Sequence, residues 1–268
     1  AFAAEQAVRS SVSRRSAANA PAFEPIVAGR YVACLAHDPA QIRAAERLRF
    51  EVFNLELGEG LVGAKRTGLD EDRFDFYMEH LLVVDRETNE IVGTYRLQTA
   101  AAAKKGFGFY AAAEFRLAPL EPVLDSAIEA GRACIRRDHR NGLVIGLLWR
   151  GISRYMKIHG ARYVFGCCSI SSLDPRDGVR IFRRLRRENR LHPDFYCKPH
   201  PDLRCEVDPG DLALNDDCAL PSLFEGYLLL GAQVVSAPAL DRAFGVIDFL
   251  TLIDTRRLSS RAARHFGF

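Results

Sequence analysis

Charged residues recur at the ends of apolar segments between residues 47 and 132, and an ordinary surface does not explain their spacing. Charges in such places are costly unless they are paired, so the pattern indicates a shared polar site. A site that gathers arginines and carboxylates can bind charged substrates and move protons, and this favours an enzyme. The residues concerned are Arg49, Asp72, Asp75, Arg96, Glu129 and Arg132.

The bulk composition is that of an ordinary globular protein. The chain has 268 residues, 48% hydrophobic and 26% charged, with a net charge of +3. It can bury a sizeable core, and its charge points to no particular partner. The seven cysteines include no C-x-x-C pair, which suits a reducing compartment and predicts no metal site. No run approaches the ~20 apolar residues of a spanning helix, so we expect a cytoplasmic protein, with peripheral attachment to the inner face of the membrane left open.

The hydrophobic periodicity divides the chain into alternating elements. A helix follows Asp38-Pro39, two strands at 80–85 and 90–98 form a hairpin, and Ala127–Ile135 is a strand. A helix at 141–159 then connects this strand to another at 162–168. The pattern predicts an α/β or α+β fold with a central mixed sheet flanked by helices. Further elements are expected as helices at 175–189 and 222–230 and strands at 233–236 and 246–253.

One domain is expected over residues 30–257, with an irregular excursion at 191–221 where prolines and aspartates gather. Residues 1–29 are expected to be mobile or to lie on a surface, and they lack the apolar core of a secretory signal. Residues 258–268 are expected to be a C-terminal tail.

Several motifs carry a resemblance to a known family. The spaced charges look like a pattern shared by acyl-homoserine-lactone synthases and N-acyl amino acid synthases of the GNAT fold. Other segments resemble the L-ornithine Nα-acyltransferases that use acyl carrier protein. These segments are His80-Leu-Leu-Val-Val-Asp85, Val92-Gly-Thr-Tyr-Arg-Leu97, Leu148-Trp149-Arg-Gly151, Phe165-Gly-Cys167 and Pro221-Ser-Leu-Phe-Glu-Gly-Tyr-Leu-Leu-Leu-Gly-Ala232. The lactone synthases carry a tryptophan after the first helix, where this chain has Glu56-Leu-Gly-Glu-Gly60.

The resemblance implies a GNAT-like, mostly antiparallel sheet and acyl transfer to an amine. Glu129 would be the catalytic base, directly or through one water, because a carboxylate in a partly buried cleft has a raised pKa. The structural alternative is an ion pair with Arg132. Glu129 and Arg132 are three residues apart, so a flat strand would place them on opposite faces. A bulge at Ala130-Gly131 would bring them together, and the splayed strand would leave an N–H for the oxyanion.

The same resemblance implies that the other charged residues bind the amino acid that accepts the acyl chain. Asp72 and Asp75 would attract the two ammonium groups of ornithine, while Arg49, Arg96 and Arg132 would bind its carboxylate or hold the aspartates. Phe53 follows Arg49 in the same motif. An ion-pair lattice that fastens a loop to the sheet is an equal alternative.

The donor would be acyl carrier protein, whose phosphopantetheine arm should lie at the glycine-containing turn before the helix at 141–159. The turn is a degenerate form of the GNAT phosphate loop, which suits a carrier-bound arm better than coenzyme A, and a solvated basic turn is the alternative. No cofactor is expected to be tightly bound. The predicted phosphopantetheine-binding residues are Arg137, Arg140, Asn141, Gly142 and Ser169.

The helix at 175–189 is rich in arginine and has a stripe of Val179, Phe182 and Leu185 that we expect to be buried. Its basic face would dock an acidic carrier protein or an anionic lipid surface, unless it is simply a solvated face. No aromatic residues interleave with the arginines, so nucleic acid is not expected. The predicted docking residues are Arg180, Arg183, Arg184 and Arg187.

The expected function is transfer of a 3-hydroxylated fatty acyl chain to the α-amine of ornithine, the chain type being implied by the resemblance alone. Another amino acid acceptor, such as glycine or lysine, and a lactone synthase are the enzymatic alternatives. A peripheral membrane-binding protein is the alternative without catalysis. His80 and Asp85 match the H-x4-D motif of glycerolipid acyltransferases, but an offset of five on a strand puts them on opposite faces. Cys167, Asp241 and Asp248 are interpreted as structural.

Overall fold

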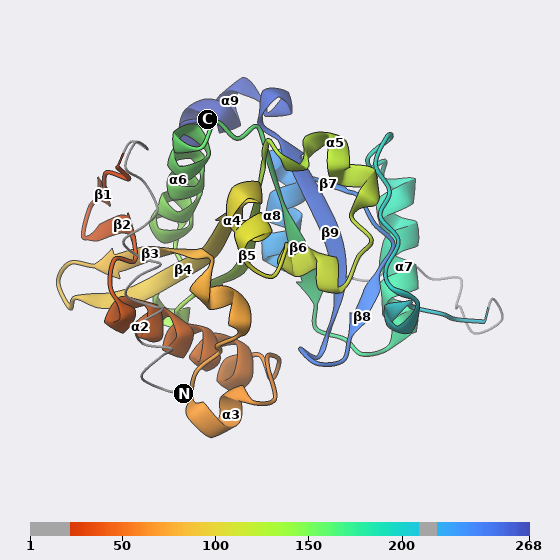
Figure 1. Ribbon diagram of the computed structural model, residues 1–268, viewed down its shortest axis with the longest axis horizontal. Helices are drawn as coiled ribbons and strands as arrows, with labels where there is room; N and C mark the ends of the chain where they lie inside the picture. Colours follow the sequence, from red (N-terminus) through yellow and green to blue (C-terminus); the bar gives the residue numbers. More distant parts are fainter. Residues whose placement is uncertain (1–21, 209–218) are drawn as a thin grey trace.

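A computed structural model of the chain describes residues 22–208 and 219–268. Its centre is a nine-stranded sheet in the order β1-β2-β3-β4-β5-β6-β9-β7, with β8 paired to β9 (Figure 1). Among the named strands of the described residues, β5 and β6 form the one parallel pair, so the mixed, mostly antiparallel sheet expected from the sequence is confirmed. The strands are β1 (Ile26–Ala28), β2 (Tyr31–Leu35), β3 (Glu79–Asp85), β4 (Glu90–Thr99), β5 (Ala127–Ile135), β6 (Tyr163–Ile170), β7 (Gln233–Val234), β8 (Ala239–Asp241) and β9 (Val246–Asp254).

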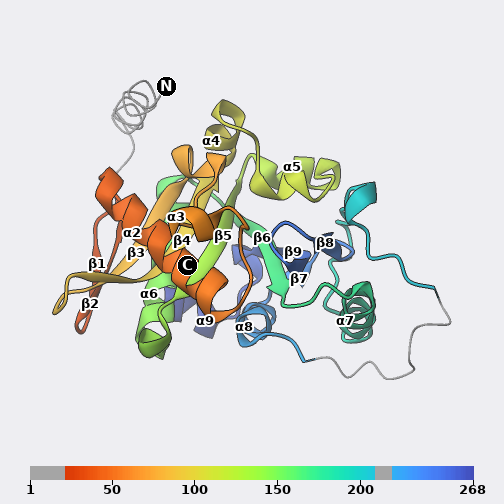
Figure 2. The same cartoon turned by 90° about the horizontal axis from the view of Figure 1, so that it is seen from below.

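Helices cover both faces of the sheet, as Figure 2 shows with the sheet close to edge-on. On one face, which we call the α2 face, lie α2 (Pro39–Phe50), α3 (Ala64–Thr67), α4 (Ala100–Lys105) and α5 (Glu121–Leu124). On the opposite α6 face lie α6 (Gly142–Ile158), α7 (Pro175–Arg187), α8 (Ser222–Leu230) and α9 (Ser260–Phe266). No helix of the described residues is long and apolar enough to cross a membrane.

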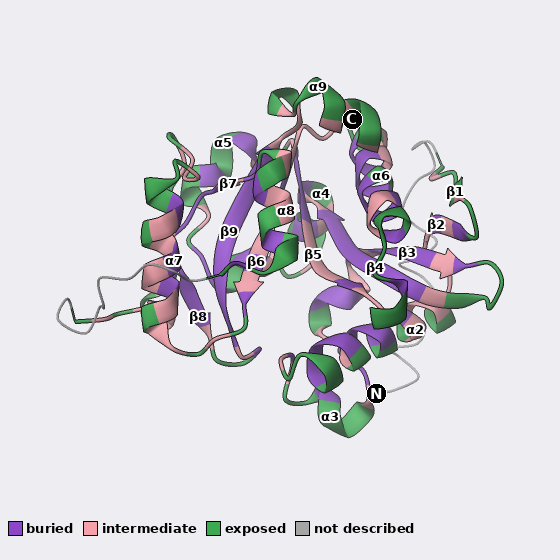
Figure 3. Cartoon of the chain, turned by 180° about the vertical axis from the view of Figure 1, so that it is seen from behind, coloured by how far each residue is buried: buried purple, intermediate pink, exposed green. Residues whose placement is uncertain are grey.

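The largest apolar core lies between α6 and the strands. Leu147, Leu148 and Ile152 on α6 pack against side chains such as Leu81 and Leu97 of the sheet. Figure 3 shows the central strands as the most continuously buried part of the molecule. The helix begins where Asn141 accepts hydrogen bonds from the backbone N–H groups of Leu143 and Val144, as an N-cap residue does.

Helix α2 delivers one arginine to the interior. Asp38 caps it through the N–H of Gln41, and Pro39 occupies the first helical position, as the sequence indicates. The helix continues as a π-helical turn at Glu51–Glu56. Its inward side carries Leu48 and the fully buried Arg49. The helix therefore places a charge within a packed face, where it requires partners.

Strand β5 contains the predicted bulge, but two residues later than expected. Arg96 of β4 pairs with Gly131 and Thr94 pairs with Cys134, so Arg132 and Ala133 together oppose Tyr95. Arg132 has a φ of 53°, in the left-handed region that non-glycine residues rarely adopt. The extra residue turns the Arg132 side chain to the α2 face, which it shares with Glu129.

Strands β5 and β6 separate after a short parallel contact. Their pairing ends at Glu129 and Phe165, while β6 continues beside β9 to Ile170. Gly166 lies at the point of separation, where a Cβ atom would collide with the carbonyl oxygen of Ala130. Glycine is therefore required for this close approach, and the opening beyond it is called the β5–β6 fork.

Some expected boundaries differ from the structure. Strand β1 lies within the segment expected to be mobile, because Ile26–Ala28 pairs with β2; residues 1–21 of that segment lie outside the described residues. The tail expected at 258–268 contains α9, whose Phe266 packs near Trp149. The described part of the 191–221 excursion contains a 3-10 turn at Pro201–Leu203 and isolated β-bridges, and is otherwise irregular.

Candidate active site at the fork between β5 and β6

Three arginines from three elements meet three aspartates of one loop on the α2 face. Arg49 comes from α2, Arg96 from β4 and Arg132 from the β5 bulge, and the aspartates belong to the segment 70–75. We call these six residues the ion-pair network. The nitrogen–oxygen distances are 3.0 Å for Arg49 Nε–Asp70 Oδ1, 2.9 Å for Arg49 Nη2–Asp75 Oδ1, 2.8 Å for Arg96 Nη1–Asp72 Oδ1, 3.1 Å for Arg96 Nη1–Asp75 Oδ1 and 3.2 Å for Arg132 Nε–Asp70 Oδ1.

Burial makes the charges of the network interdependent. Burial alone would raise the pKa of Asp75, but the guanidinium groups of Arg96 and Arg49 reverse that effect and hold the pKa below its usual range. His80 lies beside Arg49, and burial lowers the pKa of its imidazole to about 4. His80 is therefore neutral at neutral pH, so the positive charges that pair with the aspartates come from the arginines.

The predicted substrate residues Asp72 and Asp75 are thus engaged within the protein. Asp72 also caps the 3-10 helix Arg73–Phe76, and Asp75 Oδ2 accepts a hydrogen bond from the Asp72 N–H. These are the contacts of the ion-pair lattice that the sequence offered as an alternative. Phe53 is buried against Phe244, with ring centroids 5.5 Å apart, and so belongs to the packing around the network. Direct substrate binding by these residues remains a prediction.

Glu129 is buried beside the fork and is held by three donors. Gln98 Nε2 lies 2.7 Å and the Tyr110 N–H nitrogen 2.8 Å from Oε2, and the Ala111 nitrogen lies 2.7 Å from Oε1. Burial raises the pKa of Glu129, while these hydrogen bonds partly oppose the rise. A carboxylate has about four acceptor positions, so one lone pair remains for a water or an amine. Its partners are these donors rather than Arg132.

Arg132 points from the bulge into the same region. Its guanidinium carbon lies 4.3 Å from the centre of the Phe244 ring and 4.9 Å from that of Tyr110. Nη1 donates to the Tyr110 hydroxyl at 3.3 Å, whereas Nη2 is buried without a hydrogen bond and lies 3.5 Å from Asp72 Oδ2. The bulge therefore costs backbone strain of about 1–2 kcal/mol and brings a partly unsatisfied cation to the site.

The predicted phosphopantetheine residues lie on the two sides of the fork. Arg140 forms a two-point ion pair with Glu56, with nitrogen–oxygen distances of 2.6 and 2.8 Å, and Arg137 is exposed. Asn141 accepts from two of the first N–H groups of α6, so the helix N-terminus before the exposed Gly142 is already partly satisfied. Ser169 donates to Asp248 Oδ1 at 2.6 Å. Contact of these residues with a phosphate stays a prediction.

A second group of titratable side chains, which the sequence did not single out as a site, lies on the same face. Glu114, Cys167 and Asp248 place one ligand atom each within 4.8 Å of one another. Glu114 follows the 3-10 helix Tyr110–Ala113, Cys167 is on β6 and Asp248 is on β9. The only sequence signal was an aspartate within the apolar run of β9, and no local pattern joins it to Glu114.

The arginine helix α7 differs in detail from the prediction. Its buried residues are Gly178, Ile181 and Leu185, whereas Val179 and Phe182 of the expected stripe are only half-buried. The side chain of Arg180 pairs with Asp177, and that of Arg184 pairs with Glu188. Exposed arginines at positions 183, 186 and 187 form its outer face.

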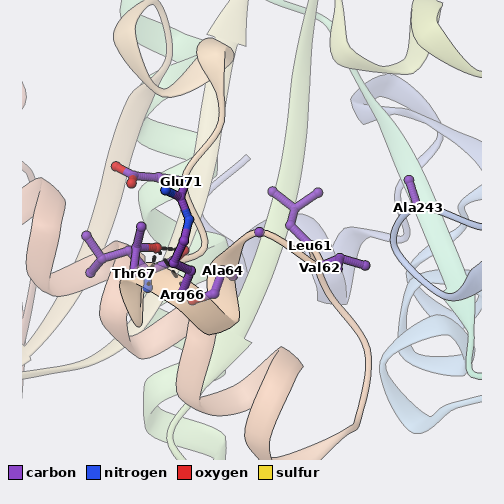
Figure 4. Close-up of a pocket in the computed structure, with 9 residues that line it drawn as sticks. Leu61, Val62, Ala64, Arg66, Thr67, Glu71 and Ala243 are labelled. Carbon is purple, nitrogen blue, oxygen red and sulfur yellow. Dashed lines mark hydrogen bonds between the residues drawn. The ribbon is translucent and has the colours of Figure 1, made fainter.

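An apolar pocket of about 410 Å³ borders the ion-pair network (Figure 4). Leu61, Val62 and Leu69 line it from the loop that leads to Asp70, and Ala243 lines it from the turn before Phe244. Figure 4 shows Leu61 and Val62 between α3 and Ala243. The pocket thus lies between two segments whose neighbouring residues, Asp70 and Phe244, contact Arg132.

Comparison with known proteins defines the class first. Residues 48–150 match the family model of the acetyltransferase (GNAT) domain. The solved structure of FeeM, an N-acyl amino acid synthase from uncultured soil microbes, has the same fold, with a TM-score of 0.51 and 12% identity over 86% of this chain and 95% of that one. The fold is therefore that of the GNAT acyltransferases.

Sequence relatives narrow this class to a family. The L-ornithine N(alpha)-acyltransferase of Brucella abortus is 35% identical over 87% of each chain. The protein of the same name from Rhizobium meliloti is 32% identical over 87% of this chain and 83% of its own length. The chain belongs to the L-ornithine Nα-acyltransferase family of acyltransferases, as the sequence motifs predicted.

The first prediction tests whether the ion-pair network stabilises the fold. The substitution Arg49→Met removes one of the two arginine partners of Asp70 and of Asp75 and leaves both carboxylates buried. Breaking a buried pair in this way costs about 3–5 kcal/mol, and we expect that loss in the free energy of unfolding measured with urea. The control is Lys104→Met, which breaks an exposed pair with Asp125 and should cost about 0–1 kcal/mol. Equal losses in the two variants would show that the network does not stabilise the fold.

Proposed function

We propose that this protein transfers a fatty acyl chain from the thioester of acyl carrier protein to the α-amine of ornithine. The observation that carries the proposal is the meeting of Glu129 and Arg132 on one face at the β5–β6 fork, in a chain that is 35% identical to an L-ornithine N(alpha)-acyltransferase over 87% of its length. Beyond Glu129 the strands β5 and β6 no longer pair, which suits an extended thioester arm and an amine that must meet there.

The reaction needs one proton acceptor and one oxyanion donor. The amine nitrogen attacks the thioester carbonyl carbon, the new C–N bond forms, and the C–S bond breaks to release the pantetheine thiol. Glu129, whose pKa is raised by burial, accepts the ammonium proton directly or through one water. The edge of β5 that leaves β6 after Glu129 supports stabilisation of the oxyanion by a backbone N–H.

Carrier protein as donor is supported by the charge of α7. Its exposed arginines follow directly on β6, which forms one side of the fork. Acyl carrier proteins are acidic, and complementary charge speeds encounter and fixes orientation. The occupied N-cap of α6 also leaves little of the helix N-terminus for the additional phosphates of a free coenzyme.

The second prediction concerns the substrates. Incubated with 3-hydroxyacyl carrier protein, the protein should form an amide with ornithine faster than with lysine, glycine or S-adenosylmethionine. Mass spectrometry of the product identifies the acceptor. Release of methylthioadenosine would instead identify a lactone synthase, and an absence of amide with every amine would refute the proposal. Replacing the carrier with acyl-coenzyme A separates the two donors.

The third prediction concerns Glu129. Replacing Glu129→Gln should lower kcat by about 10²–10⁴-fold with little change in the KM for ornithine, because the loss is in proton transfer. Full recovery of the rate at high ornithine concentration would make Glu129 a binding residue.

A companion variant separates catalysis from structure. Gln98→Met removes a hydrogen bond that stabilises the ionised form of Glu129, and so the pKa of Glu129 should rise further. Activity should then be lost at a higher pH as the solution is acidified, seen as a shift of the acidic limb of kcat/KM. An unchanged limb, in a variant with a normal melting temperature, would contradict the role of Glu129 as base.

The fourth prediction concerns α7. Reversing Arg183→Glu and Arg186→Glu should raise the KM for acyl carrier protein and remove its salt dependence, because docking charges are screened over about 8 Å at physiological salt. The matched control reverses two exposed arginines on α9, Arg261→Glu and Arg264→Glu. Identical salt profiles for the two double variants would exclude α7 as the docking surface, and liposome binding would then test the membrane alternative.

A further inference from the structure

Glu114 and Asp248 form a buried acidic pair that lacks a cation. Both side chains are almost fully buried, and Cys167 Sγ lies 3.8 Å from Glu114 Oε2. Within the described ranges, no lysine, arginine or histidine forms an ion pair with either carboxyl. The pair differs in this from Asp70 and Asp75, whose charges are matched by arginines.

Burial and closeness disfavour two negative charges on such carboxyls. Burial, together with the charge of Asp248, raises the pKa of Glu114 well above its usual value, and burial raises the pKa of Asp248 to about 6. Asp241, Cys167, Ser169, Tyr110 and Arg132 are the polar groups around the pair. A buried acid pair of this kind can exchange a proton for a cationic ligand.

Arg132 provides a second, independent sign of a ligand. Its side chain is 8% exposed, and Nη2 has no hydrogen-bond partner. Its charge lowers the pKa of both Glu114 and Asp248, so the guanidinium lies within electrostatic reach of the pair. A buried N–H without an acceptor is costly unless a ligand supplies one. Asp70 and Asp72 balance the charge of Arg132, with Asp72 Oδ2 3.5 Å from Nη2, but Nη2 still lacks a hydrogen-bond acceptor. The region therefore lacks one acceptor for Nη2 and one cation for the acid pair.

Register on the sheet gives the spacing between these groups. Glu129 pairs with Phe165, and Cys167, which lies against Glu114, is two residues further along the same face of β6. Two residues of a strand span about 6.6 Å. Glu129 and Glu114 therefore lie at successive levels along one face of β6, an arrangement that suits a substrate with two amino groups.

We propose that Glu114 and Asp248 bind the side-chain ammonium of the acceptor amino acid, while Arg132 Nη2 binds its carboxylate and the α-amine lies at Glu129. The inference rests on the proposed function and assigns the selectivity for a diamino acid to Glu114 and Asp248. Asp72 and Asp75, the carboxylates that the sequence suggested for this task, are matched by Arg49 and Arg96 and are not required for it. A neutral side chain would leave the acid pair without a partner, and sites of this kind discriminate strongly.

The test compares ornithine with norvaline, which lacks the distal ammonium. Glu114→Gln should raise the KM for ornithine by about 10- to 100-fold, the range for losing a charged hydrogen-bond partner. The KM for norvaline and for the acyl carrier protein should stay within about twofold of wild type, because neither contacts the pair. Asp125→Asn, at an exposed carboxylate, is the matched control and should change nothing. Equal changes in KM for ornithine and norvaline would overturn the inference.

A binding measurement separates this inference from the proposed function. In calorimetry of the full chain without acyl donor, ornithine should release a proton from the acid pair and norvaline should not, when two buffers of different ionisation enthalpy are compared. Glu114→Gln should abolish that release, and Asp248→Asn is the second variant if Glu114→Gln lowers the melting temperature. Ornithine binding with this behaviour but without amide formation would refute only the proposed function. Amide formation with ornithine, but no proton release, would refute only the inference.

Discussion

The buried ion-pair network is the constraint on which the rest of the α2 face depends. It fastens α2 and the loop at 70–75 to the paired strands β4 and β5 at the bulge of β5. Each arginine has lost its water, so each must keep its aspartate, and each aspartate must keep its arginine. The loop is therefore fixed against the sheet, and the apolar pocket beside it has defined walls.

Two irregularities of the sheet convert this scaffold into a site. The bulge at Arg132 changes which face the side chain takes, and the close contact at Gly166 marks where β5 and β6 part. A regular strand would send Glu129 and Arg132 to opposite faces, and a regular sheet would leave no opening between them. The strained backbone of Arg132 is tolerated because aromatic rings and carboxylates hold its side chain.

The carboxylates of the α2 face fall into three groups that differ in their charged neighbours. Those of the network are ionised and matched, and they hold the loop. Glu129 is held by neutral donors, which leave its pKa raised and suit it to accept a proton. Glu114 and Asp248 form no ion pair with a cation of the described residues, and burial raises the pKa of both. One face thus holds similar acidic side chains in three electrostatic states, set by the charges and donors around each.

The sequence by itself determined the element order, the mixed sheet and the presence of a charged site. Periodicity predicts a helix such as α6 because apolar side chains at helical spacing must face a core. The spaced charges predict a common site because burying each charge without an opposite charge beside it would be costly in free energy. Family motifs then indicated acyl transfer. The spacing of Glu129 and Arg132 even required a bulge, although not its position.

The tertiary structure decided which charges are matched. In the sequence, Asp75 and Glu114 are simply two acidic residues. Only the fold places Arg49 and Arg96 beside Asp75 and places Asp248 beside Glu114. Glu114 and Asp248 are more than a hundred residues apart in the sequence, and no local pattern indicates that they are neighbours. The sheet register brings them together, and a pKa or a binding role depends on that neighbourhood rather than on residue type.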